Sequence, residues 1–201
     1  GKNPITILGG GPALGYTPAG PAHSPTEDLA YMRSLAGIEI YSPANDKVAE
    51  QIVDLTYSDP KLRYIRLERS YPKDLDSLYS DLIVDSAFLQ KGFYTIRQSP
   101  EGTISDVCVV SNGYMLGRAL KVAQKLETDG YRVCVVDLFK IKSIDLKRFS
   151  EVLQNCNIVV TLEEQFLSGG LGSYVCETLA DLGIQKRILR IGLPERYNFE
   201  N

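Results

Sequence analysis

The first 70 residues alternate short apolar runs with amphipathic stretches, each about as long as one strand or one helix. This alternation predicts, in order, strand 5–8, helix 25–35, strand 38–41, helix 45–57 and strand 64–67. The hydroxyl of Ser24 can cap the first helix, and Pro25 suits its first turn. Strands that alternate with helices are typical of an α/β fold with parallel strands.

The same alternation returns in the second half of the chain. It predicts strand 92–97, strand 107–110, helix 114–128, strand 133–137, helix 145–154, strand 157–162, helix 170–182 and strand 187–191. A turn-forming Ser-Pro-Glu-Gly sequence lies at residues 99–102, between the first two of these strands. We therefore expect those two strands to pair with each other as a hairpin, followed by a compact doubly wound α/β unit.

The stretch between the two regions shows no clear period. It contains Pro72 and several aspartates, which favours a linker. We therefore predict one unit over residues 1–72, a linker over 73–88 and a second unit over 89–201. The chain opens directly into a strand and ends without a closing helix, so we expect it to be a portion of a longer protein.

Composition restricts the partners of this chain. Its 22 basic and 25 acidic residues give a formal net charge of −3, and the basic residues are scattered. A nucleic-acid binder would gather them in a stripe, and no apolar run approaches the roughly 20 residues that cross a bilayer. The four cysteines lack C-x-x-C spacing, so we expect buried free thiols in a reducing cytoplasm. Small molecules or proteins are the expected partners, with no nucleic acid and no membrane.

Two segments invite a chemical interpretation. The loop before the first helix holds the only histidine, His23, whose imidazole can exchange protons near neutral pH. The alternative is that His23 only helps to cap the helix. Before a later helix stand Gly169, Gly170 and Gly172, which either cradle a phosphate or permit a tight turn and close packing. We favour packing, because a lone glycine cluster is weak evidence for a phosphate site.

Two motifs carry a resemblance to a known family. Residues 20–29 are Gly-Pro-Ala-His-Ser-Pro-Thr-Glu-Asp-Leu, which resembles the G-P-T-H-x-x-x-E-D-L motif of the transketolase pyrimidine-binding domain. Residues 159–165, Val-Val-Thr-Leu-Glu-Glu-Gln, and the glycines at 169–172 resemble the E-E-H and G-G-x-G segment of the terminal domain. That domain is shared by transketolases, deoxyxylulose phosphate synthases and the β subunits of pyruvate dehydrogenases. The motifs follow the family order and spacing.

The resemblance implies a fold for each unit. Residues 1–72 would be the C-terminal half of a truncated pyrimidine-binding α/β domain. Residues 89–201 would be the transketolase C-terminal domain, a small three-layer α/β/α fold with a mostly parallel sheet.

The resemblance also implies thiamine diphosphate and Mg as cofactors of the complete enzyme, which would transfer a two-carbon ketol unit between sugar-type substrates. In the family, the glutamate that activates the aminopyrimidine ring lies upstream of Gly1, and the diphosphate and its magnesium bind on a different domain. We therefore expect this chain to bind neither cofactor alone, to hold no metal and to be inactive by itself. Its partners would be a second copy, an N-terminal transketolase-like subunit, or both, with a sugar or sugar-phosphate substrate.

Two residues acquire roles from the resemblance. His23 falls on the substrate-contacting histidine and is the candidate catalytic residue, while Arg69 falls on the arginine that grips the substrate phosphate. Without the resemblance, Arg69 would be taken as a surface charge. Ala19 stands where the family has an acidic residue, Gly11 where it has an upstream histidine, and Gln165 where E-E-H has its histidine. Because the first two changes remove polar contacts to a ketose, we expect a substrate other than a standard pentose phosphate.

Other functions stay open at this point. The chain could be a dimerisation or interaction module of such an enzyme, since terminal domains of this kind bury large surfaces. It could also be a β-type subunit of a 2-oxoacid dehydrogenase or of a deoxyxylulose-phosphate-synthase-like enzyme. A dinucleotide-binding protein is disfavoured, because no G-x-G-x-x-G follows a strand.

Overall fold

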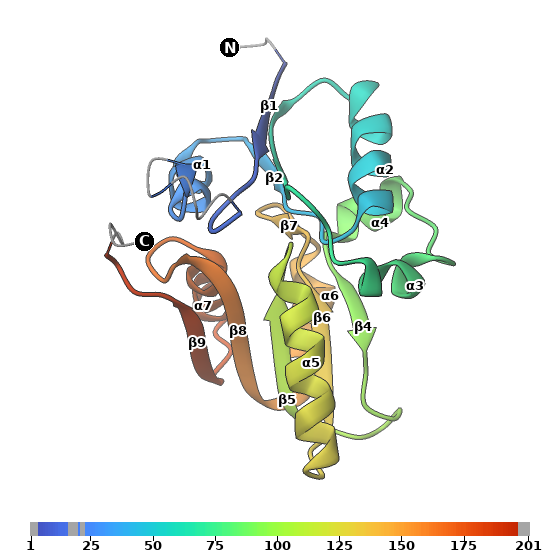
Figure 1. Cartoon of the computed structure of the whole chain (residues 1–201). Helices are drawn as coiled ribbons and strands as arrows, with labels where there is room; N and C mark the ends of the chain where they lie inside the picture. Colours follow the sequence, from blue (N-terminus) through green and yellow to red (C-terminus); the bar gives the residue numbers. More distant parts are fainter. Residues whose placement is uncertain (1–3, 16–19, 21–22, 197–201) are drawn as a thin grey trace.

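The computed structural model describes residues 4–15, 20 and 23–196, and it confirms the α/β class (Figure 1). The strands form a four-stranded sheet, in the order β1-β3-β2-β7, and a five-stranded sheet, in the order β4-β6-β5-β8-β9. The strands are β1 (Ile5–Gly10), β2 (Glu39–Tyr41), β3 (Leu62–Leu67), β4 (Tyr94–Arg97), β5 (Ser105–Ser111), β6 (Val133–Asp137), β7 (Lys140–Ile141), β8 (Cys156–Phe166) and β9 (Arg187–Leu193). The helices are α1 (Asp28–Ser34), α2 (Asp46–Tyr57), η3 (Lys73–Leu75), α3 (Asp76–Tyr79), α4 (Ser86–Lys91), α5 (Met115–Thr128), α6 (Leu146–Gln154) and α7 (Leu171–Asp181).

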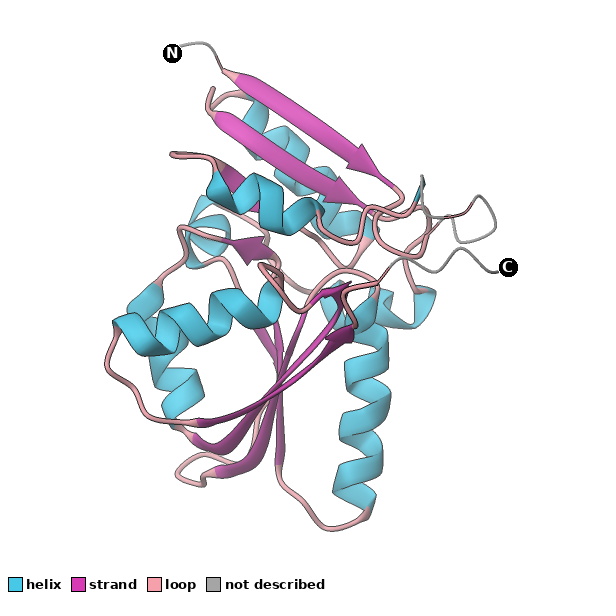
Figure 2. Cartoon of the chain, turned by 90° about the vertical axis from the view of Figure 1, so that its left-hand side faces the viewer, coloured by secondary structure: helices cyan, strands magenta, loops and turns pink. Residues whose placement is uncertain are grey.

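The five-stranded sheet is the middle of three layers (Figure 2). Successive side chains of a strand point to opposite faces, so β5 and β6 each contribute to two hydrophobic clusters. Val109 and Val135 pack in the cluster that contains Leu116 of α5. Cys108 and Val136 pack in the cluster that contains residues of α6 and α7. Helices therefore cover both faces, as the family resemblance implied.

The smaller sheet is completed by a strand from the second half of the chain. Strands β1, β3 and β2 run parallel, while β7 pairs antiparallel with β2 through Ile40 and Ile141. The segment over 73–88, predicted to be a linker, contains η3, α3 and the start of α4, and it buries Leu75 and Tyr79. The two sheets are thus joined by packing as well as by the chain, and the predicted domain limits stay a prediction.

The predicted hairpin is wrong. Strand β4 pairs antiparallel with β6, through Thr95 and Val136, and not with β5. Both edges of β5 are occupied by parallel neighbours, β6 on one side and β8 on the other. Because β5 is central, only the outer edge of β6 was free to accept β4.

The first helix begins later than the sequence suggested, at Asp28 instead of residue 25. The carbonyl of Pro25 accepts a hydrogen bond from Ala13 N–H (3.3 Å), and the carbonyl of Thr26 accepts one from Phe166 N–H (2.9 Å). The hydroxyl of Ser24 donates to Gly20 O and does not cap the helix. These carbonyls are committed to other segments, so the helix can start only after them.

The thiol prediction holds for three of the four cysteines. All four are free, and Cys108, Cys134 and Cys156 are buried, whereas Cys176 on α7 is only half-buried. Within the described ranges, no helix is long and apolar enough to cross a membrane.

Candidate functional site

A cavity of about 680 Å³ lies where the two halves of the chain meet. It is bounded by the carboxyl end of β3, the first turn of α5, the end of β8 and the loop after β1. The described residues that line it are Leu14, Gly15, Glu68, Arg69, Ser70, Tyr114, Met115, Arg118 and Glu164. Ligands of α/β proteins commonly bind beyond the carboxyl ends of parallel strands, so this cavity is the candidate site.

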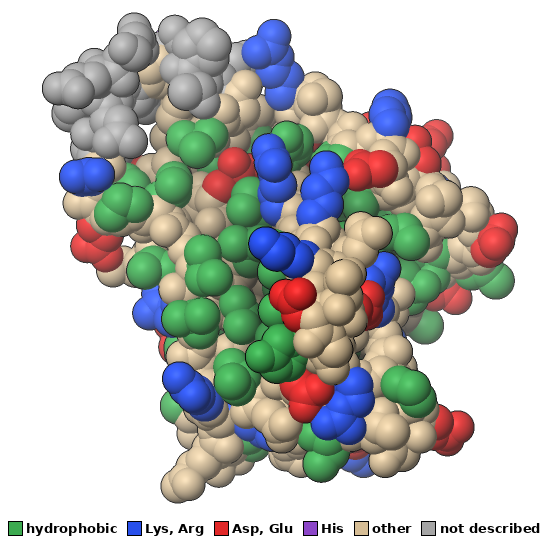
Figure 3. All heavy atoms as spheres, turned by 60° about the horizontal axis from the view of Figure 1, so that its bottom comes forward, with side chains coloured by type: hydrophobic (Ala, Val, Ile, Leu, Met, Phe, Trp, Pro, Cys, Tyr) green, Lys and Arg blue, Asp and Glu red, His purple; other side chains and the backbone are tan. Residues whose placement is uncertain are grey.

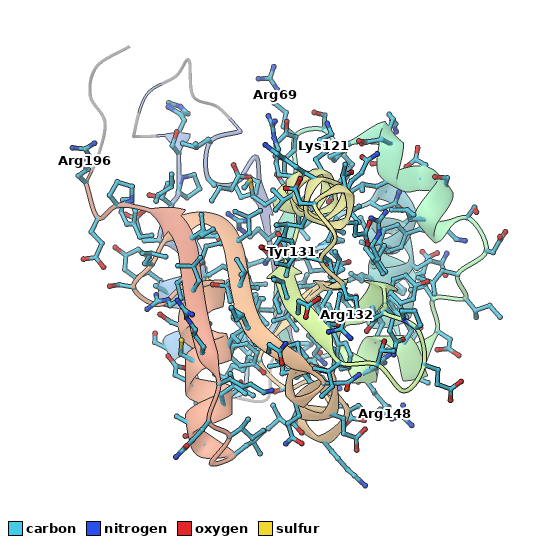
Figure 4. All side chains as sticks on the ribbon, turned by 90° about the horizontal axis from the view of Figure 1, so that it is seen from below. Arg69, Lys121, Tyr131, Arg132, Arg148 and Arg196 are labelled. Atoms are coloured by element: carbon cyan, nitrogen blue, oxygen red, sulfur yellow. The ribbon has the colours of Figure 1, made fainter. Side chains whose placement is uncertain are left out.

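The structure brings one of the two predicted site residues into this cavity. Arg69 lines it directly after β3, and its side chain points outward on the side of the molecule where α5 lies (Figure 4). His23 is exposed, its backbone N–H donates to Gly20 O at 3.1 Å, and it is not among the described lining residues. Ala19 lies outside the described residues, and Gly11 is buried with its N–H bonded to Leu67 O at 2.9 Å. The roles of His23 and Arg69 therefore stay proposals.

A buried ion pair lies beside the cavity. Arg66 Nε is 2.8 Å from Asp28 Oδ2, and the hydroxyl of Tyr64 donates to the same oxygen at 2.7 Å. The amide of Gln165 is assigned with its oxygen toward Arg66, since the opposite orientation would face donors to donors. That oxygen then accepts from Arg66 Nη2 at 2.6 Å, and the amide nitrogen donates to Glu163 at 3.3 Å. The network joins α1, β3 and β8.

The glycine-rich turn before α7 is filled by a carboxylate of the chain itself. Glu163 accepts hydrogen bonds from Leu171 N–H at 2.6 Å and from Gly172 N–H at 2.8 Å. A Cβ at Gly170 would lie 2.1 Å from Glu163 Oε2, and Gly169 has a φ of +75°. The free amides that would bind a phosphate are thus already used, which supports packing as the role of these glycines.

Two carboxyl groups, Glu68 and Glu164, line the cavity together. Burial raises the pKa of Glu68, whose Oε1 accepts a hydrogen bond from Tyr114 N–H at 3.2 Å. Burial also raises the pKa of Glu164 to about 7; the charge of Glu68 adds to this shift, and the charge of Arg66 opposes it. Near neutral pH, Glu164 can therefore hold or release a proton inside the cavity.

Sequence analysis did not identify Arg66, Asp28 or Arg118 as residues of this region. A charged residue inside the apolar run of β3 was the available signal for Arg66, because a strand buried on both faces seldom carries an unpaired charge. Asp28 was assigned only to the start of a helix. Arg118 is one polar position on an amphipathic helix, and no local pattern distinguishes it from its neighbours.

The described residues do not form a site for a magnesium-bound diphosphate. Among them, no group of three or more histidine, cysteine, aspartate or glutamate side chains could hold a metal ion. The cavity presents two guanidinium groups and two carboxyl groups, of which one carboxyl favours the protonated form up to neutral pH. No step is therefore derived through the coenzyme on this chain.

An α/β chain with two joined sheets and a polar cavity between them defines the class of this protein. Residues 100–200 match the family described as "Transketolase, C-terminal domain", and the chain belongs to this family. This confirms the resemblance that the two motifs indicated.

Similar proteins extend over nearly the whole chain. It is 30% identical over 178 residues to 1-deoxy-D-xylulose-5-phosphate synthase of Pseudomonas savastanoi pv. phaseolicola, covering 89% of this chain and 26% of that protein. It is 27% identical over 192 residues to an apulose-4-phosphate transketolase subunit of Actinobacillus succinogenes, covering 95% and 58%. A solved structure described as "Split gene transketolase, inactive beta4 tetramer" matches with a TM-score of 0.79 at 29% identity, covering 95% of this chain and 58% of that one. The chain thus spans about a quarter of the synthase and over half of the other two.

Proposed function

We propose that this chain is the C-terminal part or subunit of a thiamine-diphosphate-dependent, transketolase-like enzyme that transfers a two-carbon ketol unit between sugar-type substrates. The observation that carries the proposal is Arg69, at the family position for phosphate binding, on the wall of a polar cavity at the junction of the two sheets. The similarity to an apulose-4-phosphate transketolase subunit along 95% of the chain supports it.

The residues of this chain would bind and orient the substrate. Arg69 would hold the phosphate end of a sugar phosphate, because a planar guanidinium can donate two parallel hydrogen bonds to it. His23, exposed on the loop before α1, would contact a hydroxyl or carbonyl oxygen of the substrate where this chain faces the rest of the enzyme. Thiamine diphosphate, held with Mg by that other part, would supply the carbanion chemistry. A cytoplasmic location accords with this function.

The test compares the full chain alone with the complex that it forms. The tagged chain is purified from the cells that produce it, and ketol transfer is measured with thiamine diphosphate, Mg and a panel of ketoses and ketose phosphates. We expect no turnover by the chain alone and turnover by the complex that co-purifies with it. In the complex, Arg69→Met should raise KM for phosphorylated donors, while Arg187→Met, which changes an exposed arginine on β9, should not. Turnover by the chain alone, or a complex inactive with every donor, would contradict the proposal.

A second function, self-association, is favoured by an exposed apolar surface. Hydrophobic side chains gather over β8 and β9, beside α5 (Figure 3). On β9, Leu189 is 54% exposed and Ile191 is 45% exposed. Large apolar patches on a protein surface mark interaction sites, and a relative with the same fold is described as a β4 tetramer. We propose a second copy of this chain as the occupant of this surface.

Light scattering tests this association. We expect the chain to have at least twice the mass of one copy, and Leu189→Glu together with Ile191→Lys to shift it toward the mass of a monomer. Both side chains point away from the buried core, so the fold should be retained, as circular dichroism would check. A wild-type chain that is strictly monomeric at concentrations up to the millimolar range would exclude this role.

A further inference from the structure

A second arginine faces the candidate site from the opposite wall. Arg118 lies on the first turn of α5 and lines the same cavity as Arg69, which follows β3. The two arginines therefore come from the two different halves of the chain. Within the part of the chain that the structure describes, Arg118 is exposed and makes no hydrogen bond or ion pair. Its guanidinium donors are available to a ligand in the cavity.

The charges around the cavity favour an anion that carries two negative charges. Arg69 and Arg118 contribute two positive charges, and Glu68 and Glu164 contribute two negative charges only when both are ionised. Protonation of Glu164 leaves the wall with an excess of positive charge. A phosphate monoester has three terminal oxygens and a charge near −2, so it can accept hydrogen bonds from two guanidinium groups on opposite sides.

We propose that Arg118 is a specificity-determining residue that binds the phosphate end of a sugar-phosphate substrate between itself and Arg69. The proposal rests on the proposed function and deepens it, because it names the end of the substrate that this cavity holds. A phosphate clamped by residues of both halves would be positioned more firmly than one held by Arg69 alone.

The carboxyl pair adds a dependence on pH. Glu68 and Glu164 line the cavity with the arginines, and Arg66 is the buried cation next to them. Since the ionised form of Glu164 repels a phosphate dianion, binding of a sugar phosphate should take up a proton and weaken above about pH 7. Glu164→Gln should remove most of this dependence.

Binding is measured by titration calorimetry on the full chain with ribose 5-phosphate, ribose and inorganic phosphate. We expect ribose 5-phosphate to bind more tightly than the other two ligands, and Arg118→Met to weaken it by about tenfold, as for loss of one charge-assisted contact. Arg118→Lys should restore part of the affinity. Lys121→Met, one turn further along α5 on a side chain 67% exposed, is the matched control and should have no effect.

Each other outcome overturns the proposal. If Arg118→Met binds ribose 5-phosphate as tightly as the wild type, Arg118 does not contact the phosphate. If ribose binds as well as ribose 5-phosphate, or if no ligand binds, the cavity is not a phosphate site. If inorganic phosphate binds as tightly as ribose 5-phosphate, the cavity recognises the free anion and not a sugar phosphate.

Kinetics of the complete complex separate this inference from the proposed function. Arg118→Met should raise KM for phosphorylated substrates about tenfold with kcat retained, and leave unphosphorylated substrates unchanged, because it removes binding common to ground and transition states. A complex that is inactive with every substrate would reject the proposed function while the binding result still decides the role of Arg118. An active complex with unchanged KM in Arg118→Met would reject the inference alone.

Discussion

The guanidinium of Arg66 and the carboxylate of Asp28 form an ion pair, with 2.8 Å between Nε and Oδ2, in the interior of the protein. Their side chains are 1% and 8% exposed. The pair fixes the first residue of α1 against β3, beside the cavity, and so positions the end of the loop that carries His23. Burying two charges costs free energy of desolvation, which the hydrogen bonds from Tyr64 and to Gln165 partly offset.

Removal of one partner of this pair should destabilise the fold strongly. Asp28→Asn leaves the charge of Arg66 buried without its counterion, and we expect a loss of about 3–5 kcal/mol in the free energy of unfolding, measured by urea denaturation. Asp106→Asn is the control, because Asp106 pairs with Arg132 at the surface and its loss should cost far less. Equal losses in the two variants would show that the buried pair has no special weight.

The ion pair also shows what the sequence could and could not indicate about the fold. Apolar periodicity located the parallel strands and their helices, since burial of one helix face or one strand run is encoded locally. The partner of β4 was predicted wrongly, because pairing depends on which strand edge is free after the other strands have assembled. The start of α1 was misplaced for a similar reason, as Ala13 and Phe166 take the carbonyls that a helix would need.

Asp137 should make stability depend on pH. Its side chain is fully buried, Tyr79 donates to Oδ2 at 2.6 Å, and burial raises its pKa to about 7. An unfolded aspartate has a pKa of about 3.9, so the folded protein holds the proton more tightly. This contribution is complete below about pH 4 and is lost as pH rises through about 7.

Asp137→Asn should flatten this dependence. The amide keeps an oxygen that accepts from Tyr79 but cannot ionise, so its stability should fall less between pH 5 and pH 8 than that of the wild type. Urea unfolding at both pH values measures the difference. Part of the slope should remain, because burial raises the pKa values of Glu163 and Glu164 to about 7 as well. Identical slopes in the variant and the wild type would refute a role for Asp137.

Gly170→Ala should disrupt the start of α7. The new methyl group would lie 2.1 Å from Glu163 Oε2, so the carboxylate must move and release the amides of Leu171 and Gly172. We expect a loss of about 1–3 kcal/mol in urea denaturation, the usual range for overpacking. Gly10→Ala is the matched control, since no atom lies within 4 Å of its Cβ position. A Gly170→Ala protein as stable as Gly10→Ala would contradict the steric argument.

The candidate site was predictable only in part, for a physical reason. Arg69 could be located because a family motif and a strand end coincide there, but Arg118 and Glu164 join it through the packing of α5 and β8 against the other half. Contacts between segments that are distant in sequence leave no local pattern. His23 was conspicuous as the only histidine, yet its place outside the described cavity lining could be learned only from the structure.

The cysteines should differ in reactivity according to their burial. Cys108, Cys134 and Cys156 are 0%, 4% and 1% exposed, and Cys176 is half-buried on α7. A thiol reagent such as dithionitrobenzoate should therefore modify one thiol rapidly in the native protein and all four after denaturation, and Cys176→Ser should abolish the rapid phase. Because burial raises the pKa of Cys176, the rapid phase should accelerate as pH rises from 7 to 9. A rapid phase that persists in Cys176→Ser would show that one of the three core thiols is accessible through an opening of the five-stranded sheet.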